Sequence, residues 1–104
     1  MAITLQKGKR GMDKFEVILS PHATKDLDGF SDAICKKIAS ALKTLAESPF
    51  PRGRLIKKLK GKSTDFYRLR VDKYRVFYVI ESGRVVILRV LSRKDAERYI
   101  RNLD

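Results

Sequence analysis

Runs of strand-forming residues flank a segment with helical spacing, and this pattern predicts the order of elements along the chain. Residues 15–19 are rich in strand formers, and Ser20 and Pro21 follow as an N-cap and a first helical residue. We therefore expect a strand and then a short helix that ends near Gly29. Ser31 offers a second N-cap, and apolar residues after it recur at helical spacing: Ile34, Ile38, Ala41, Leu42 and Leu45. The second helix should end before the next proline, and the two helices should form an antiparallel hairpin.

The remainder of the chain predicts four strands and a final helix. Residues 55–59 form a short run of strand character after a proline-rich breaker region. Three longer runs occupy residues 66–71, 74–81 and 84–91. Only two residues separate each of these runs from the next, so the three strands should be antiparallel neighbours joined by tight turns. Ser92 then offers the N-cap of a final short helix.

The predicted order is β-α-α-β-β-β-β-α, an α+β fold in which an antiparallel β-sheet carries the helical hairpin on one face. The other face should be free for a ligand. Residues 1–13 are polar and broken by glycines, so we expect a flexible N-terminal tail there and a single domain at residues 14–104. A chain of 104 residues, 43% of them hydrophobic, can bury one core.

Positive charge is concentrated in the second half of the chain. The formal net charge is +12, which predicts a polyanionic partner. Residues 1–49 contain 8 basic and 6 acidic side chains, whereas residues 50–104 contain 16 basic and 6 acidic ones. A basic run is typical of a solvated face or of a surface that binds RNA phosphates. The candidate RNA-binding residues are Arg52, Arg54, Lys57, Lys58, Lys60, Lys62 and Lys94.

Cysteine and histidine offer little chemistry in this sequence. The single cysteine, Cys35, cannot form an intrachain disulfide and lies near the apolar stripe of the second helix, where it should pack in the core. The single histidine, His22, falls in the first helical turn, where an exposed or capping role is expected. The acidic residues lack metal-ligand spacing, and no apolar run approaches the roughly 20 residues of a membrane span. We expect a soluble cytoplasmic protein that uses no metal ion or other cofactor.

Three arginines should share one face of the predicted sheet. If a two-residue turn joins the strands at residues 66–71 and 74–81, Arg70 lies directly opposite Arg75. Arg68 points to the same face as Arg70, because side chains repeat every second residue along a strand. Each guanidinium could extend into water or pair with a carboxylate at a strand end. A cluster of permanently charged forks is better explained as a phosphate site.

These residues carry a resemblance to a known family. The order of elements, the segment FYRLRVDKYRVFYVI at residues 66–80 and the segment RKDAERY at residues 93–99 resemble the RelE/ParE superfamily of bacterial and archaeal toxins. The resemblance extends from about Phe15 to Ile100. RelE-type members are metal-independent endoribonucleases that cut mRNA on the ribosome and are held inactive by an antitoxin. The resemblance implies the same toxin function here, with a cognate antitoxin, the ribosome and mRNA as partners.

The resemblance also implies a set of catalytic residues: Arg68, Arg70, Arg75, Arg93 and Tyr99. A ribose 2′-hydroxyl would attack the adjacent phosphate, so the site must stabilise negative charge on the phosphoryl oxygens. Arginines suit that task, and Tyr99 would stack on a base or orient the ribose.

This chain departs from the family pattern at two points. Ribosome-dependent members tend to carry lysine where Arg68 and Arg70 stand, and arginine is a poor general base because it rarely loses its proton. The base is therefore unassigned, with Lys57, Lys58 and Lys60 as the candidates. The spacing from Arg93 to Tyr99 is also longer than in many members, so Lys94 is an alternative to Arg93.

Two other functions fit the same sequence. A ParE-type toxin shares the fold and inhibits DNA gyrase by binding it, without nuclease activity. A noncatalytic RNA-binding module would satisfy the charge alone. The basic cluster together with a C-terminal arginine and tyrosine favours the nuclease, because a gyrase inhibitor has no evident need for them.

Overall fold

The computed structural model describes residues 3–6 and 14–102. The first half contains β1 (Ile3–Gln6), β2 (Glu16–Leu19), α1 (Pro21–Asp28) and α2 (Asp32–Glu47). The second half contains β3 (Ile56–Leu59), β4 (Phe66–Val71), β5 (Tyr74–Glu81), β6 (Arg84–Ser92) and α3 (Arg93–Arg101). From residue 14 onward, every predicted element is present and its ends agree with the prediction to within one or two residues. Ser20, Ser31 and Ser92 are the N-caps of the three helices, and each side chain accepts a hydrogen bond from a backbone N–H of the first turn.

The strands form one six-stranded sheet in the order β1-β2-β6-β5-β4-β3. The strands β3 to β6 are consecutive antiparallel neighbours, which confirms the predicted meander. The prediction of a purely antiparallel sheet is wrong at one point, because β2 pairs with β6 in parallel. Antiparallel pairing is imposed only where the connection is short. The two helices and three strands that separate β2 from β6 leave either direction open.

The N-terminal segment also differs from the expectation of a tail. Residues 3–6 form the edge strand β1, which pairs with β2 in antiparallel register. Backbone N–H and C=O groups along the outer edge of β2 are free to pair, and four residues suffice to occupy them. The remainder of the expected tail, residues 1–2 and 7–13, lies outside the described part of the chain.

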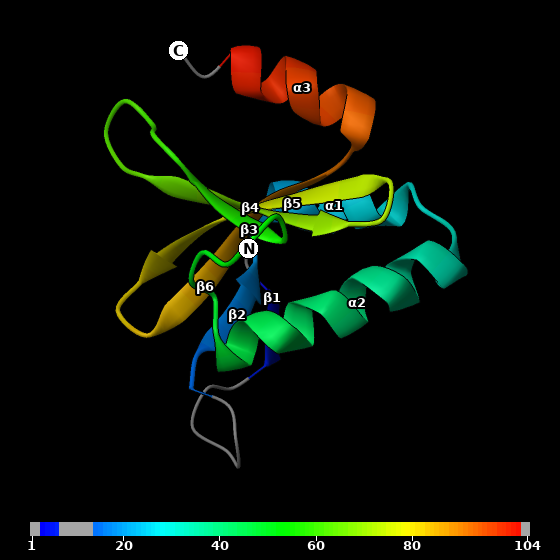
Figure 1. Ribbon diagram of the computed structural model, residues 1–104. Coiled ribbons are helices and arrows are strands. Elements are labelled where there is room, and N and C mark those ends of the chain that lie inside the picture. Colours follow the sequence, from blue (N-terminus) through cyan, green and yellow to red (C-terminus); the bar gives the residue numbers. More distant parts are fainter. Residues whose placement is uncertain (1–2, 7–13, 103–104) are drawn as a thin grey trace.

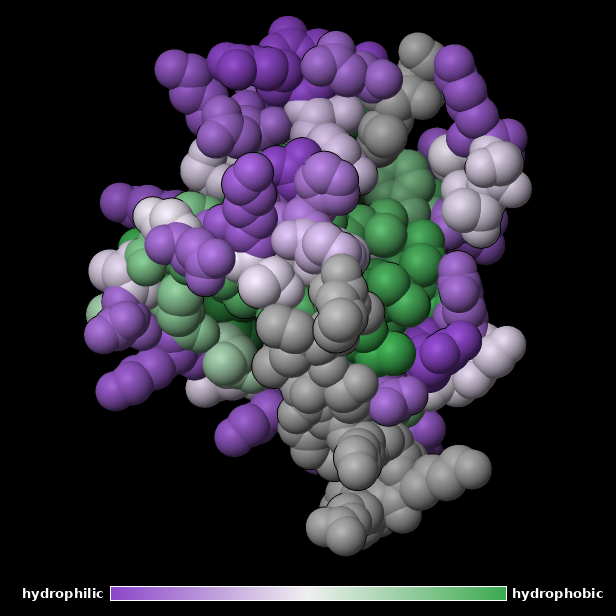
Figure 2. Space-filling view, turned by 180° about the vertical axis from the view of Figure 1, so that it is seen from behind, coloured by the Kyte–Doolittle hydropathy of each residue, from purple (hydrophilic) through white to green (hydrophobic). Residues whose placement is uncertain are grey.

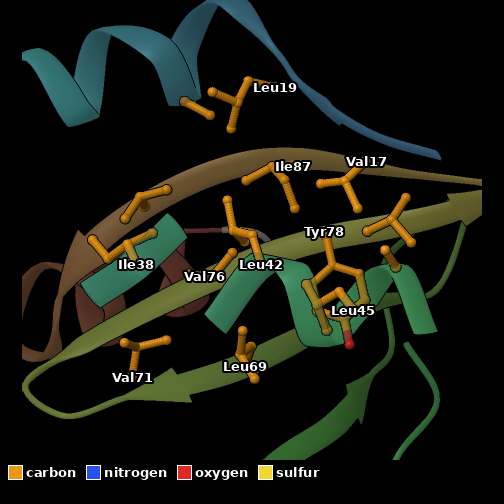
Figure 3. Close-up of a cluster of buried hydrophobic side chains, with 14 of the residues drawn as sticks. Val17, Leu19, Ile38, Leu42, Leu45, Leu69, Val71, Val76, Tyr78 and Ile87 are labelled. Carbon is orange, nitrogen blue, oxygen red and sulfur yellow. The ribbon is translucent and has the colours of Figure 1, made fainter. Parts of the chain in front are cut away.

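The main hydrophobic core lies between α1, α2 and one face of the sheet (Figure 1). Ile38, Leu42 and Leu45 of α2 point toward the strands, as the helical spacing predicts (Figure 3). Tyr78 of β5 lies in the same core, and its hydroxyl donates a 2.8 Å hydrogen bond to the carbonyl oxygen of Pro49. This core fixes the strands whose opposite faces carry the candidate site.

The opposite face of the sheet is covered in part by α3, which lies across the sheet from α2 (Figure 1). Phe66, Phe77 and Leu91 of the sheet form a second cluster with Ala96 of α3, and Tyr99 packs against it. The expectation that this whole face is free for a ligand is therefore wrong. The chain reverses at Ser92 and brings α3 back over the strands, because the apolar side chains of a short amphipathic helix need a surface to cover.

Candidate functional site

The turn between β4 and β5 creates the site. Asp72 adopts the left-handed conformation with φ of +54°, which aspartate tolerates better than most residues and which a tight hairpin turn requires. The resulting register places Arg70 opposite Arg75, as the sequence predicts, and Arg68 opposite Phe77. All three arginines therefore project from the sheet face that α3 partly covers.

Arg75 is the one charged side chain among the buried residues of the described chain, and only 8% of its surface is exposed. Its Nη1 donates to the carbonyl oxygens of Asp72, at 2.9 Å, and Tyr74, at 2.8 Å. Burial lowers the pKa of Arg75, and the nearby charges of Arg70, Arg68 and Arg93 lower that pKa further. No salt bridge within the described residues compensates this charge. A buried cation whose only hydrogen-bond partners are neutral carbonyl groups favours the binding of an anion beside it.

Arg68 lies on the neighbouring strand β4, and only part of its guanidinium group is hydrogen-bonded. Its Nη2 donates to the carbonyl oxygen of Arg54 at 3.0 Å, while its buried Nε has no hydrogen-bond partner within the described structure. Burial lowers the pKa of Arg68, and the charge of Arg70 adds to that effect. Arg70 itself is exposed, so it can reach a ligand without rearranging the sheet.

Arg93 joins this group from the start of α3. Its backbone N–H donates to the carbonyl oxygen of Lys73 at 2.8 Å, which anchors the helix at the β4–β5 turn. Its charge lowers the pKa of Arg75, so the two guanidinium groups lie within electrostatic range. We call Arg68, Arg70, Arg75 and Arg93 the arginine cluster. Four like charges repel one another, and a bound phosphate would relieve that repulsion.

Tyr99 lies beside the arginine cluster, not within it. Its half-buried ring packs on Phe77 with the centroids 4.9 Å apart, and Phe77 is the neighbour of Arg68 across the strands and of Arg75 along its own strand. The guanidinium carbon of Arg89 lies 5.7 Å from the centre of the Tyr99 ring. Burial raises the pKa of Tyr99, although Arg89 lowers it. The phenol is therefore protonated at neutral pH and can donate a hydrogen bond.

An apolar cleft of about 250 Å³ lies on the side of Tyr99 that faces the β3–β4 connection. Phe66, Val79 and Leu88 supply apolar side chains to its lining, and Lys62 lines it as well. Figure 2 shows this apolar area below α3, with hydrophilic side chains around it. Gly61 shapes the wall, because a Cβ there would collide with the carbonyl oxygen of Thr64. An apolar cleft beside a cluster of arginines suits a nucleobase next to its phosphate.

The structure separates the lysines that the sequence groups as candidate bases. Lys57 lies opposite Arg68 in the β3–β4 register and therefore on the face of the arginine cluster. Lys58 lies opposite Tyr67, on the other face, and forms a 3.2 Å salt bridge with Asp65. Lys60 is exposed beyond the end of β3.

The other predicted RNA-binding residues occupy the rim of the molecule. Arg52 pairs through its backbone with Ile56 at the edge of β3, and its charge acts on Tyr78 on the opposite side of the sheet from the cluster. Arg54 touches the cluster through its carbonyl oxygen. Lys94 is exposed on the first turn of α3, next to Arg93.

Sequence reasoning missed two residues at this site, Asp26 and Arg89. The carboxylate of Asp26 accepts hydrogen bonds from Nε of Arg89, at 2.8 Å, and from Nη2 of Arg89, at 3.0 Å. Their positions are 63 residues apart in the chain, and no local pattern links them. Of the residues that the sequence sets aside, His22 is exposed, and Cys35 lies with its Sγ 3.3 Å from the carbonyl oxygen of Leu27.

Two further observations concern metal ions and membranes. Across residues 3–6 and 14–102, no three His, Cys, Asp or Glu side chains are grouped so that they could hold a metal ion. None of the three helices in the described chain is long and apolar enough to cross a membrane.

This sheet, with two helices on one face and one on the other, is the fold of RelE toxins. The structure resembles the archaeal RelE–RelB complex from Pyrococcus horikoshii OT3, with a TM-score of 0.66 and 26% identity over 77% of this chain and 96% of the other. It also resembles the Mycobacterium tuberculosis toxin–antitoxin complex RelBE2, with a TM-score of 0.64 and 27% identity over 78% of this chain and 99% of the other.

Sequence comparison specifies the family. Residues 17–97 match the family model described as the ParE toxin of the type II toxin–antitoxin system parDE. The chain is 37% identical over 84 residues to a Methanocaldococcus jannaschii protein named "Putative toxin RelE1", which covers 79% of this chain and 92% of that protein. The chain therefore belongs to the ParE toxin family and is a toxin of a type II toxin–antitoxin system.

Proposed function

We propose that this toxin is a ribosome-dependent mRNA endonuclease. The observation that carries the proposal is the arginine cluster: three arginines of one sheet face, one of them buried, lie near Arg93 of α3, and none of the four forms a salt bridge within the described residues. Proteins seldom bury an uncompensated charge for the sake of the fold alone, because removing an ion from water costs roughly several kcal/mol. A buried, unpaired arginine is expected at a site that binds a phosphate during the reaction, because the phosphate then supplies the opposite charge.

In the proposed reaction, the 2′-hydroxyl of one nucleotide loses its proton to a base and attacks the neighbouring phosphorus. The bond from phosphorus to the 5′-oxygen then breaks, and that oxygen takes up a proton. The products are a 2′,3′-cyclic phosphate and a 5′-hydroxyl. Arg68, Arg70, Arg75 and Arg93 stabilise the extra negative charge on the phosphoryl oxygens, because their charge is fixed in place before the substrate arrives.

Lys57 and Tyr99 complete the proposed site from two directions. Lys57 shares the face of the arginine cluster, which favours it over Lys58 and Lys60 as the base for the 2′-hydroxyl. Tyr99 stacks on a base or orients the ribose, because its ring stands between the cluster and the apolar cleft. The remaining basic residues of the β3 region bind the backbone of the RNA on the ribosome.

The cognate antitoxin of this proposal is an acidic or amphipathic protein. Two of the structures that the chain resembles are complexes of a RelE toxin with a RelB antitoxin. A chain with a net charge of +12 favours a partner of opposite charge, which would cover the arginine cluster and keep mRNA out.

Cleavage on programmed ribosomes tests the proposal. The purified toxin should cut mRNA at codon positions, as mapped by primer extension, and Arg70→Ala should lower the rate by roughly 10²-fold through lost charge stabilisation. Arg84→Ala is the matched control, because Arg84 is also an exposed arginine of the same sheet but lies at the β5–β6 turn. Intact mRNA in ribosomes whose translation the toxin has stopped would contradict the proposal.

Inhibition of DNA gyrase is the second candidate, and the match to a family model that carries the ParE name favours it. A supercoiling assay with purified gyrase separates the two functions. The nuclease proposal expects no inhibition of supercoiling at toxin concentrations that cleave mRNA.

A further inference from the structure

An ion pair outside the arginine cluster connects three elements behind Tyr99. The side chain of Arg89 leaves β6 and forms a two-pronged interaction with Asp26 of α1. The same carboxylate accepts a 2.9 Å hydrogen bond from the backbone N–H of Val90. Beyond Leu19 strand β2 no longer pairs with β6, so Asp26 satisfies a donor on an otherwise open strand edge. Three hydrogen bonds therefore fix the carboxylate in one position.

Arg89 in turn presents its guanidinium to Tyr99. The guanidinium carbon lies 5.7 Å from the centre of the ring, in the geometry of a cation–π contact, and Phe77 packs on the same ring. Hydrogen bonding to Asp26 raises the pKa of Arg89, although burial lowers it. Because Nε and Nη2 are committed to Asp26, those two donors are not available to a phosphate. The side chain of Asp26 is only 14% exposed, so water weakens the pair little.

We propose that Asp26 and Arg89 are positioning residues that hold the ring of Tyr99 at the edge of the arginine cluster. This inference rests on the proposed function, since that proposal assigns Tyr99 to the reaction. Tyr99 lies in the last turn of the nine-residue helix α3, and the end turns of a helix fray most easily. The contact with Arg89, which Asp26 fixes to the sheet, keeps this ring in place while mRNA is bound.

A double-mutant cycle on cleavage tests the inference. Asp26→Asn and Arg89→Met should each lower the maximal cleavage rate on programmed ribosomes by roughly 10- to 100-fold, because a small misplacement of a reacting group costs that much. The ribosome concentration that gives half the maximal rate should stay nearly constant. In a Tyr99→Ala background, neither substitution should reduce the rate further, because both act through the ring. Losses that multiply with the loss from Tyr99→Ala would overturn the inference.

Asp28→Asn is the matched control. It removes an exposed carboxylate from the last residue of α1 and should leave the maximal rate close to that of the wild type. A loss equal to that of Asp26→Asn would attribute the effect to the charge of the helix and contradict the inference.

A second measurement does not depend on cleavage. The pKa of Tyr99 can be followed by NMR with ring-labelled tyrosine, because Tyr99→Phe removes one of only four tyrosine signals. Arg89 lowers this pKa and Asp26 raises it, so Arg89→Met should move the titration to higher pH and Asp26→Asn to lower pH. An unchanged Tyr99 titration in both variants would overturn the inference.

The two measurements distinguish the failure of the inference from the failure of the proposed function. If the wild type does not cleave mRNA but both titrations move as expected, the proposed function is wrong and the positioning of the ring stands. If the wild type cleaves mRNA while the titrations stay unchanged and the losses multiply, only the positioning is wrong.

Discussion

Single side chains of this toxin show how burial and charge compete. Arg75 is buried but remains charged, because two carbonyl oxygens replace part of its hydration and arginine almost never loses its proton. Tyr78 is buried on the opposite face, where its hydroxyl makes one hydrogen bond. Burial raises the pKa of this hydroxyl, so it stays neutral. The free energy of each site therefore depends on which groups surround the polar atom.

Arg75→Lys should retain the positive charge and lose most of the activity. A lysine ammonium cannot bind the two carbonyl oxygens of the turn and two phosphate oxygens in one plane. We expect the cleavage rate to fall by about 10²-fold or more, measured by primer extension on programmed ribosomes. Thermal unfolding followed by circular dichroism provides the control, because an unfolded variant would lose its cooperative transition. A lysine variant with wild-type activity would show that only the charge matters.

Because Tyr78 is buried, we expect the unfolding free energy of the protein to decrease at alkaline pH. Burial raises the pKa of its hydroxyl well above the ordinary value for tyrosine, so above about pH 10 the unfolded chain releases this proton and the folded chain keeps it. The contribution is therefore fully present below about pH 10 and decreases as the pH rises further. Tyr78→Phe should cost about 1–2 kcal/mol of unfolding free energy at pH 7, because the carbonyl of Pro49 loses its buried partner.

The difference in unfolding free energy between wild type and Tyr78→Phe should then shrink above pH 10. Urea titrations at pH 7 and at two values above pH 10 measure it. A difference that stays constant with pH would show that the hydroxyl titrates normally in the folded protein.

At the scale of elements, the β4–β5 hairpin and α3 build the site together. The hairpin supplies three arginines through its register, and α3 supplies Arg93 and Tyr99 from its first and last turns. The cap at Ser92 determines where α3 begins, since its hydroxyl accepts a 3.2 Å hydrogen bond from the N–H of Asp95. The start of this helix and its packing on Phe77 together set the distance between the two groups.

Ser92→Ala should weaken α3 and thereby the site. Loss of an N-cap typically costs about 1 kcal/mol, and here the first helical turn carries Arg93. We expect faster hydrogen exchange in the amides of α3, measured by mass spectrometry, with strands β4 to β6 unchanged. Ser92→Asp is the matched control, because aspartate caps helices as well as serine does. Equal exchange rates in the alanine variant and the wild type would contradict a role for the cap.

At the scale of the molecule, the sheet separates two tasks. One face packs on α1 and α2 and forms most of the core, while the other carries charge, an apolar cleft and a single short helix. The three arginines of the β4–β5 hairpin are thus carried by strands that the core holds in place. A rigid support matters for a charged site because the groups need not reorganise when the phosphate binds.

RNA binding should depend on salt in proportion to the arginine cluster. Each phosphate neutralised on single-stranded RNA contributes roughly 0.7 to the slope of log affinity against log salt concentration, so Arg70→Ala should reduce the slope by about that amount. Tyr99→Ala should lower the affinity and leave the slope unchanged, because stacking releases no counterions. Fluorescence anisotropy with a labelled oligoribonucleotide at several salt concentrations measures both. Equal slopes for wild type and Arg70→Ala would place Arg70 away from the RNA.

The sequence by itself determined most of the elements and the arginine register. Helical spacing, serine caps and two-residue turns are local signals, and the opposition of Arg70 and Arg75 follows from turn length and strand alternation alone. Three features depended on contacts between distant segments: the direction of β2 relative to β6, the position of α3 and the ion pair between Asp26 and Arg89. The parallel pairing of β2 with β6 depended on packing, because a long connection imposes no direction.

The position of α3 and the ion pair behind it were decided only by tertiary structure. No spacing rule indicates that α3 will return over Phe77, or that Asp26 will meet Arg89 across the intervening chain. Such contacts depend on how the layers stack, since a salt bridge forms only between groups that the backbone has already brought within a few ångströms. The three arginines of the β4–β5 hairpin could therefore be placed on one face from the sequence, whereas the approach of Arg93 and the support of Tyr99 required the folded molecule.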